Sequence, residues 1–142
     1  MTDIEATLLG AVIGGAIGVI GTYLGTIQTA KKSRRADANI AFYEVFRKAI
    51  RDLQSTANPP TEPQHTLNSH IEDHRSAAYR FKFFLEGDER NRFLAAWEGY
   101  YKKYKKQEFA DNGERDKRRE KIQLALDLIH KLLVFAGYEK ND

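Results

Sequence analysis

Two histidines stand four residues apart in a segment with helical periodicity, and at this spacing two imidazoles on one helix face can share a metal ion. The segment reads His70-Ile71-Glu72-Asp73-His74. In the zinc helices of proteases a glutamate directly follows the first histidine or directly precedes the second, but Ile71 and Asp73 hold those places here. His74 also falls on an apolar stripe, which favours a neutral core histidine bonded to a neighbour. His70 and His74 are therefore weak metal candidates, and no cofactor is expected.

A second pattern interleaves aromatic rings with amines in the run from Tyr100 to Lys106, Tyr-Tyr-Lys-Lys-Tyr-Lys-Lys. A platform for single-stranded nucleic acid can have this composition. Tyr100 and Tyr104, however, share a helical stripe with Trp97, which predicts a core role for the rings and a solvated or lipid-facing edge for the lysines. The net charge of +3 is also far from the dense positive field of a dedicated nucleic-acid binder, so no nucleic-acid partner is expected.

Other chemistries lack the residues they need. Cysteine is absent, which excludes disulfides, thiolate zinc sites and a cysteine nucleophile. No glycine-rich loop follows a strand pattern, which argues against nucleotide-binding motifs. The sequence therefore predicts a protein that is not an enzyme, with no identifiable small-molecule substrate.

The N-terminal segment is uncharged from Ala6 to Ala30, and no lysine or arginine precedes Lys31. Leu8 to Ile27 alone supplies about 20 residues, enough for a helix to cross a ~30 Å hydrocarbon core. The start is acidic and the apolar run is too long for a cleavable signal peptide. The segment is therefore predicted to be a single transmembrane helix, and its lack of ionisable side chains argues against a transporter.

The charges that flank this segment predict its orientation. Asp3 and Glu5 lie before it, whereas four cations follow it directly. These cations are Lys31, Lys32, Arg34 and Arg35. The positive-inside rule places the N-terminus outside and residues 31–142 in the cytoplasm. The four cations are also predicted to contact anionic lipid headgroups, at roughly 1 kcal/mol each.

Glycines within the predicted span recur at intervals of four, four, three and four residues, which keeps them on one helical stripe. They are Gly10, Gly14, Gly18, Gly21 and Gly25. A helix face without side chains lets another helix approach closely, and dispersion then drives association in lipid. We therefore expect a homo-oligomer or a complex with another membrane protein.

Beyond the cations, four apolar stripes follow the helical period. The stripes are Tyr43, Phe46, Ile50, Leu53 and Ala57; Leu67, Ile71, His74, Ala78, Phe81 and Leu85; Phe93, Trp97, Tyr100 and Tyr104; and Ile122, Leu126, Ile129, Leu133 and Ala136. Residues 58–64 are predicted to be a linker, and turn residues 111–113 to end the third helix. The sequence thus predicts an all-α chain, with a tail and membrane helix at 1–30 and a bundle of about four helices at 31–142.

The order of these segments resembles a class of uncharacterised small bacterial single-pass membrane proteins. The resemblance rests on core motifs across most of the chain. They are Ala41-Phe42-Tyr43 with Phe46; Ala77, Phe81, Phe84, Leu85 and Gly87; Phe93, Ala96, Trp97 and Tyr100; and Ile129, Leu132, Leu133, Phe135 and Ala136. The resemblance implies a bacterial origin, and with the orientation above it implies the inner membrane, but it brings no established activity.

Three functional hypotheses follow. The first is a non-enzymatic, membrane-anchored interaction or regulatory module that self-associates through the glycine stripe. The second is a membrane-permeabilising effector of a growth-arrest or phage-response system, in which glycine-packed helices form a pore. The third is an enzyme that uses a metal held by His70 and His74.

Overall fold

The computed structural model describes the backbone of residues 3–55 and 61–139 and the side chains of residues 25–55 and 61–139. Within these ranges the prediction of an all-α chain is confirmed, because the residues form five α-helices and two short 3-10 helices without any strand. The elements are α1 (Asp3–Gln54), α2 (Pro63–Asn68), α3 (Ile71–Phe81), η1 (Lys82–Phe84), α4 (Gly87–Lys105), α5 (Arg115–Leu133) and η2 (Val134–Ala136). The chain divides into two compact units, Met1–Ala36 and Asp37–Asp142.

The first unit contains the N-terminal part of α1. Most of the predicted membrane segment, with Gly10, Gly14, Gly18 and Gly21, lies outside the residues whose side chains are described. The side chains of residues 25–30 are exposed. Among the residues described, no helix contains a stretch long and apolar enough to cross a membrane. The membrane span and the glycine stripe therefore stay predictions.

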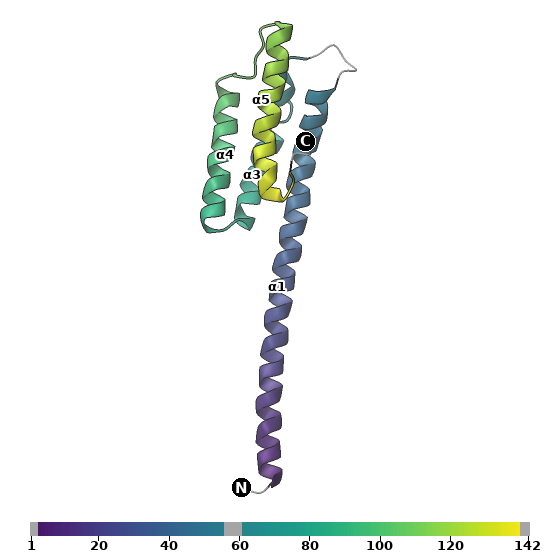
Figure 1. Cartoon of the computed structure of the whole chain (residues 1–142), viewed down its shortest axis with the longest axis vertical. Coiled ribbons are helices and arrows are strands. Elements are labelled where there is room, and N and C mark those ends of the chain that lie inside the picture. Colours follow the sequence, from purple (N-terminus) through teal and green to yellow (C-terminus); the bar gives the residue numbers. More distant parts are fainter. Residues whose placement is uncertain (1–2, 56–60, 140–142) are drawn as a thin grey trace. The chain divides into compact units, whose positions relative to one another are not determined.

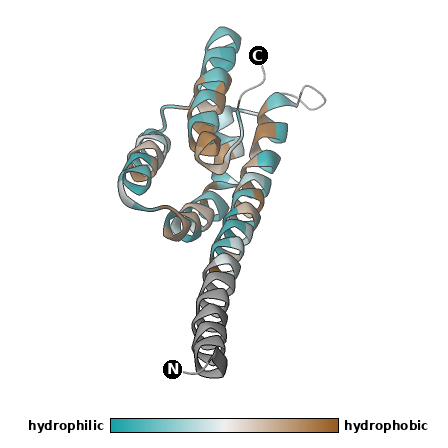
Figure 2. Cartoon of the chain, turned by 60° about the horizontal axis from the view of Figure 1, so that its bottom comes forward, coloured by the Kyte–Doolittle hydropathy of each residue, from teal (hydrophilic) through white to brown (hydrophobic). Residues whose placement is uncertain are grey.

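The second unit is a helical bundle, as predicted, formed by the C-terminal part of α1 with α2, α3, α4 and α5 (Figure 1). Figure 2 shows hydrophilic and hydrophobic residues alternating along its ribbons, as expected when each helix buries one face. Four phenylalanines from different elements meet in the core: Phe42, Phe81, Phe93 and Phe135. The rings of Phe42 and Phe81 stack at 4.4 Å, and that of Phe93 lies 5.3 Å from Phe81 and 5.6 Å from Phe135. We name them the phenylalanine cluster.

The buried face of α1 differs from the predicted stripe by a small rotation. Phe42 and Ala49 are buried with Phe46 and Leu53, whereas Tyr43 and Ile50 are only half-buried. The physical reason is that Phe42 inserts its ring into the phenylalanine cluster, while the ring of Tyr43 stacks on Tyr138 at 4.0 Å. Ala57 lies outside the described residues.

The second stripe belongs to two helices instead of one. Its six predicted members are all buried, but the chain turns between α2 and α3. At this turn the amides of Ser69 and His70 donate to the carbonyls of Thr66 and Leu67, three residues back. Such tight bonds preserve the approximate facing of side chains while interrupting the α-helix.

The predicted linker and the predicted helix end are both corrected. Pro63 starts α2, so residues 63 and 64 are helical, and residues 58–60 lie outside the described part of the chain. The third helix ends at Lys105, before the turn residues 111–113. Gln107 has a positive φ of 56°, which turns the chain and brings Phe109 into the core, fully buried.

Candidate functional site

His74 is a buried core histidine whose side chain is fully inaccessible to solvent. Its ring stacks on Phe46 with 4.1 Å between centroids, and Nδ1 lies 3.0 Å from the Tyr100 hydroxyl. With Tyr100 as the donor, the neutral ring carries its proton on Nε2, which has no hydrogen-bond partner within the described part of the chain. Burial, and secondarily the charge of His70, lowers the pKa of His74 to about 3. His74 is therefore neutral at physiological pH.

His70 makes a separate contact at the N-terminus of α3. Its Nε2 lies 2.7 Å from Oδ2 of Asp52, on α1. The rings of His70 and His74 are nearly parallel, with centroids 5.9 Å apart. Each ring thus has one nitrogen bonded to a different protein oxygen. No group of three or more histidine, aspartate and glutamate side chains suited to a metal ion occurs among the described residues.

The aromatic-lysine run is divided between the core and the surface. Tyr100 is fully buried, and burial followed by the influence of Tyr104 raises its pKa. The hydroxyl of Tyr104 donates to Asn68 at 2.8 Å, which anchors this ring to α2. Lys102, Lys105 and Lys106 are exposed. The rings of Tyr100 and Tyr104 thus stabilise the packing of the bundle.

The predicted headgroup contacts lie in α1 before the bundle. Lys31, Lys32 and Arg34 are exposed, and Arg35 is half-buried. Gly25 is the one member of the glycine stripe with a described environment, and a Cβ added there would meet no atom within 4 Å. The Thr29 hydroxyl donates to the Gly25 carbonyl at 2.9 Å, so this polar group is satisfied within the helix.

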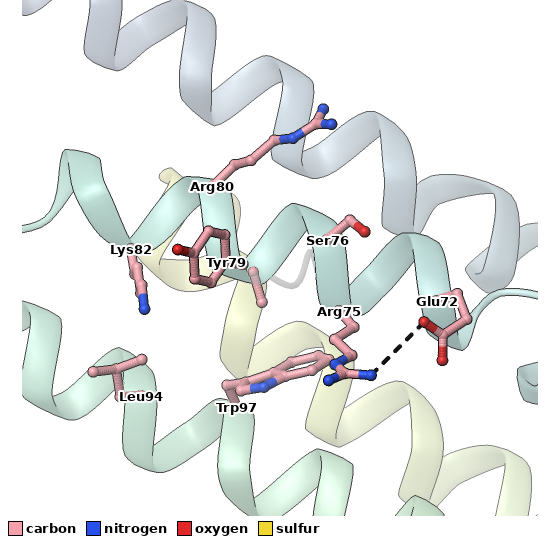
Figure 3. Close-up of a pocket in the computed structure, with 9 residues that line it drawn as sticks. Glu72, Arg75, Ser76, Tyr79, Arg80, Lys82, Leu94 and Trp97 are labelled. Atoms are coloured by element: carbon pink, nitrogen blue, oxygen red, sulfur yellow. Dashed lines mark ion pairs between the residues drawn. The ribbon is translucent and has the colours of Figure 1, made fainter.

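A groove of about 540 Å³ between α3 and α4 was not foreseen from the sequence. Figure 3 shows Arg75 and Lys82 reaching from the α3 side toward Leu94 and Trp97 on α4, whereas Arg80 points away from that helix. We name this the α3–α4 groove. The sequence does not predict it, because its walls come from two helices and the period of each helix is local. The sequence contains one signal of this groove, because Tyr79 is an aromatic residue that lies off the predicted apolar stripe. In the structure its ring is exposed.

The nitrogen of Lys82 lies 4.3 Å from the ring centroid of Tyr79 and 5.2 Å from that of Phe83. No carboxylate among the described side chains forms an ion pair with Lys82. Arg75 does have a partner, because its guanidinium lies 3.9 Å from Glu72, although both side chains are largely exposed. The groove therefore presents more cations than carboxylates, since Glu72 also lines it, beside aromatic and aliphatic side chains, an arrangement that suits an anionic amphiphile.

A polar network that the sequence did not reveal fastens the start of α2 to the connection between α4 and α5. The carboxylate of Glu62 accepts from the amide of Asp111 at 2.8 Å. Gln64 accepts from the amide of Phe109 at 3.3 Å and donates to the carbonyl of Tyr104 at 3.1 Å. We name these contacts the interloop latch. They explain why the segment around residue 62 is structured.

Asp111 itself is buried, with 1% of its side chain exposed, and it pairs with Arg118 at 2.5 Å. The Arg118 hydrogen bond, together with the amide of Gly113, holds the pKa of Asp111 below its usual range. This pair fixes the turn that begins α5, which gives both groups a structural role.

The chain matches no described protein family, and no curated protein sequence or solved structure is detectably similar to it.

Proposed function

We propose that the protein is a single-pass inner-membrane protein, in which residues 6–30 span the bilayer and the bundle is a non-enzymatic interaction or regulatory module in the cytoplasm. The observation that carries this proposal is the charge-free run from Ala6 to Ala30, bounded by acidic residues before it and by four cations after it. Two features of the described side chains of α1 support it. A Cβ added at Gly25 would meet no described atom within 4 Å, and the Thr29 hydroxyl donates to the Gly25 carbonyl within the helix, as lipid requires.

The bundle supports a binding role over a catalytic one. The buried polar side chains described in it are held in contacts that stabilise the core, a turn or a connection; they are His74, Tyr100, Gln64 and Asp111. Chemistry needs a polar group that is accessible to a substrate, and these groups are not. An enzyme that uses His70 and His74 would instead contain stoichiometric metal after purification, and metal-free protein of normal stability would rule that hypothesis out.

Membrane insertion is tested by fractionation and by a reporter fused after Asp142. We expect the native protein in the inner-membrane fraction and a reporter that is active in the cytoplasm. Native protein in the soluble fraction, or a reporter that is active only outside the inner membrane, would refute the proposal. Affinity purification from native membranes through a tag at the same position would then identify the partner.

Self-association is tested by replacing Gly14 and Gly18 together with leucine. Filling the stripe with side chains should abolish crosslinked dimers in membranes, because the helices could no longer approach closely. A matched control replaces Val12 and Val19, on the opposite helix face, with leucine and should leave crosslinking unchanged. Equal crosslinking in both variants would reject the stripe as the interface.

The glycine stripe also favours the second candidate, a pore-forming effector. Induced expression combined with dye uptake separates the two, because an interaction module leaves the membrane potential intact whereas a pore admits the dye. Dye uptake that disappears in the Gly14 and Gly18 double variant would establish the pore instead.

A further inference from the structure

Exposed hydrophobic side chains gather at one end of the bundle. Among the described residues of the second unit, the large exposed ones are Ile40, Tyr79, Phe83, Phe84, Leu94 and Val134. Each lies within three residues in sequence of a member of the phenylalanine cluster. Because the members of that cluster contact one another, their sequence neighbours surround the same end of the bundle. Scattered exposed hydrophobics are ordinary, but these lie around one end of the bundle, and the rings of Tyr79 and Phe83 contact each other with centroids 5.4 Å apart, which favours an interaction surface there.

The opposite end has a different character. There the interloop latch joins Glu62 and Gln64 to the connection between α4 and α5, and no large hydrophobic side chain described at that end is exposed. The bundle is thus polarised along its length, with a polar end and an aromatic end. The α3–α4 groove opens beside the aromatic end, since Tyr79, Lys82 and Leu94 line it.

From this arrangement we propose that the α3–α4 groove binds the headgroup of an anionic phospholipid and docks the aromatic end of the bundle on the bilayer surface. Tyr79 and Phe83 are 61% and 60% exposed, and amphipathic or aromatic rings of this kind settle at the headgroup level. Lys82 lies over both rings and has no carboxylate partner among the described side chains, so its charge is available to a lipid phosphate. Arg75 supplies a second cation in the same groove (Figure 3).

Two considerations favour lipid over other occupants. A second copy docking through the same surface would add another Lys82 and Arg75 to a groove whose one lining carboxylate among the described residues, Glu72, already pairs with Arg75, which is unfavourable. The membrane proposed above also lies close by along the chain, because only nine residues lie between Ala30 and Ile40. The inference therefore rests on the proposed function for proximity to a bilayer, but the groove itself is a separate site.

The test uses the full-length protein in nanodiscs and its one tryptophan, Trp97, which lines the groove. Nanodiscs of phosphatidylcholine are compared with nanodiscs that also contain phosphatidylglycerol, each with lipids brominated near the headgroup as quenchers. We expect quenching of Trp97 to be at least about twofold greater with the anionic lipid, since each cation near the surface favours anionic lipid about fivefold. Equal quenching in the two compositions would overturn the inference.

A matched pair of variants separates the groove from general electrostatics. Lys82→Glu should return quenching to the phosphatidylcholine level. Lys105→Glu should not change it, although Lys105 also lies over a tyrosine ring, 5.5 Å from the centroid of Tyr101, because it lies outside the groove. An equal loss in both variants would show that only net charge matters and would reject the site.

Two further arms identify the ligand and separate this inference from the proposed membrane span. In detergent, inorganic phosphate should leave Trp97 emission unchanged. A change as large as that caused by anionic lipid would show a small-anion site and overturn the lipid assignment.

A fluorophore on Val19→Cys, in a chain that has no other cysteine, reports insertion of residues 6–30 through acyl-chain quenchers. A quenched Val19 label with an unresponsive Trp97 rejects the groove but keeps the span, whereas the reverse keeps the groove and rejects the span.

Discussion

Acid should destabilise the bundle through His74 at a pH well above that at which carboxylates are protonated. In the folded state the pKa of this ring is about 3, compared with an ordinary value of 6.5 in the unfolded chain. Below pH 6.5 the unfolded state therefore binds a proton that the folded state does not, so stability falls as the pH falls. At about 1.4 kcal/mol per pH unit, the loss between pH 8 and pH 5 is roughly 2 kcal/mol, and it continues down to the folded pKa.

The assay is urea unfolding of the full-length protein in detergent micelles, followed by Trp97 fluorescence at pH 8 and pH 5. The decisive variant is His74→Gln, whose amide cannot be protonated in this range but can still accept a hydrogen bond from Tyr100. We expect the variant to be less stable at pH 8, because it loses the ring stacked on Phe46, an interaction of about 0.5–1.5 kcal/mol. Its stability should nevertheless change much less between the two pH values. The same acid-induced loss in the variant and the natural chain would refute the reasoning.

Three further outcomes are expected from the same urea assay. Phe46→Ala should cost about 3–5 kcal/mol, because the ring is fully buried and leaves a cavity. Gly137→Ala should lower the free energy of unfolding by about 1 kcal/mol, because the φ of +81° at this position disfavours any side chain. Gly99→Ala should instead raise it by about 0.5–1 kcal/mol, because Gly99 lies in the interior of α4 with open space around it. If both substitutions shift the midpoint in the same direction, backbone conformation is not the cause. Asp111→Asn should reduce stability at neutral pH, because the carboxylate, whose pKa is lowered in the fold, stabilises the folded state above its ordinary pKa. The natural chain loses this contribution as Asp111 is protonated in strong acid, so the variant should lose less stability there.

Periodicity predicted much of the bundle because burial of one helix face repeats along the chain. All six residues of the second stripe are buried, including His74, even though a turn divides that stripe between two helices. The turn could not be predicted, since its two tight hydrogen bonds involve backbone groups that any residue supplies. The small rotation of α1 toward Phe42 likewise depends on partners in α3 and α4.

The structural features that the sequence did not predict lie outside the segments with helical periodicity or depend on more than one helix. Phe109 is buried in a connection, and Asp111 has a partner seven residues ahead in a helix that begins with mixed charges. The α3–α4 groove requires Tyr79 and Trp97 from separate helices to face one another across it, which only the packed bundle specifies. Tertiary packing thus determined the candidate site, whereas local spacing determined the core.

The interloop latch has a consequence for the order of folding. Gln64 and Phe109 are 45 residues apart, and closing a loop of that length costs about 3 kcal/mol or more in chain entropy. Its two neutral hydrogen bonds at Gln64 are worth about 1 kcal/mol each, and the bond to the Glu62 carboxylate is worth about 1.5–3 kcal/mol. They roughly offset that cost only after hydrophobic packing has brought the ends together. The amide protons of Phe109 and Asp111 should therefore become protected from exchange late in refolding, and they mark the moment at which assembly of the bundle is complete.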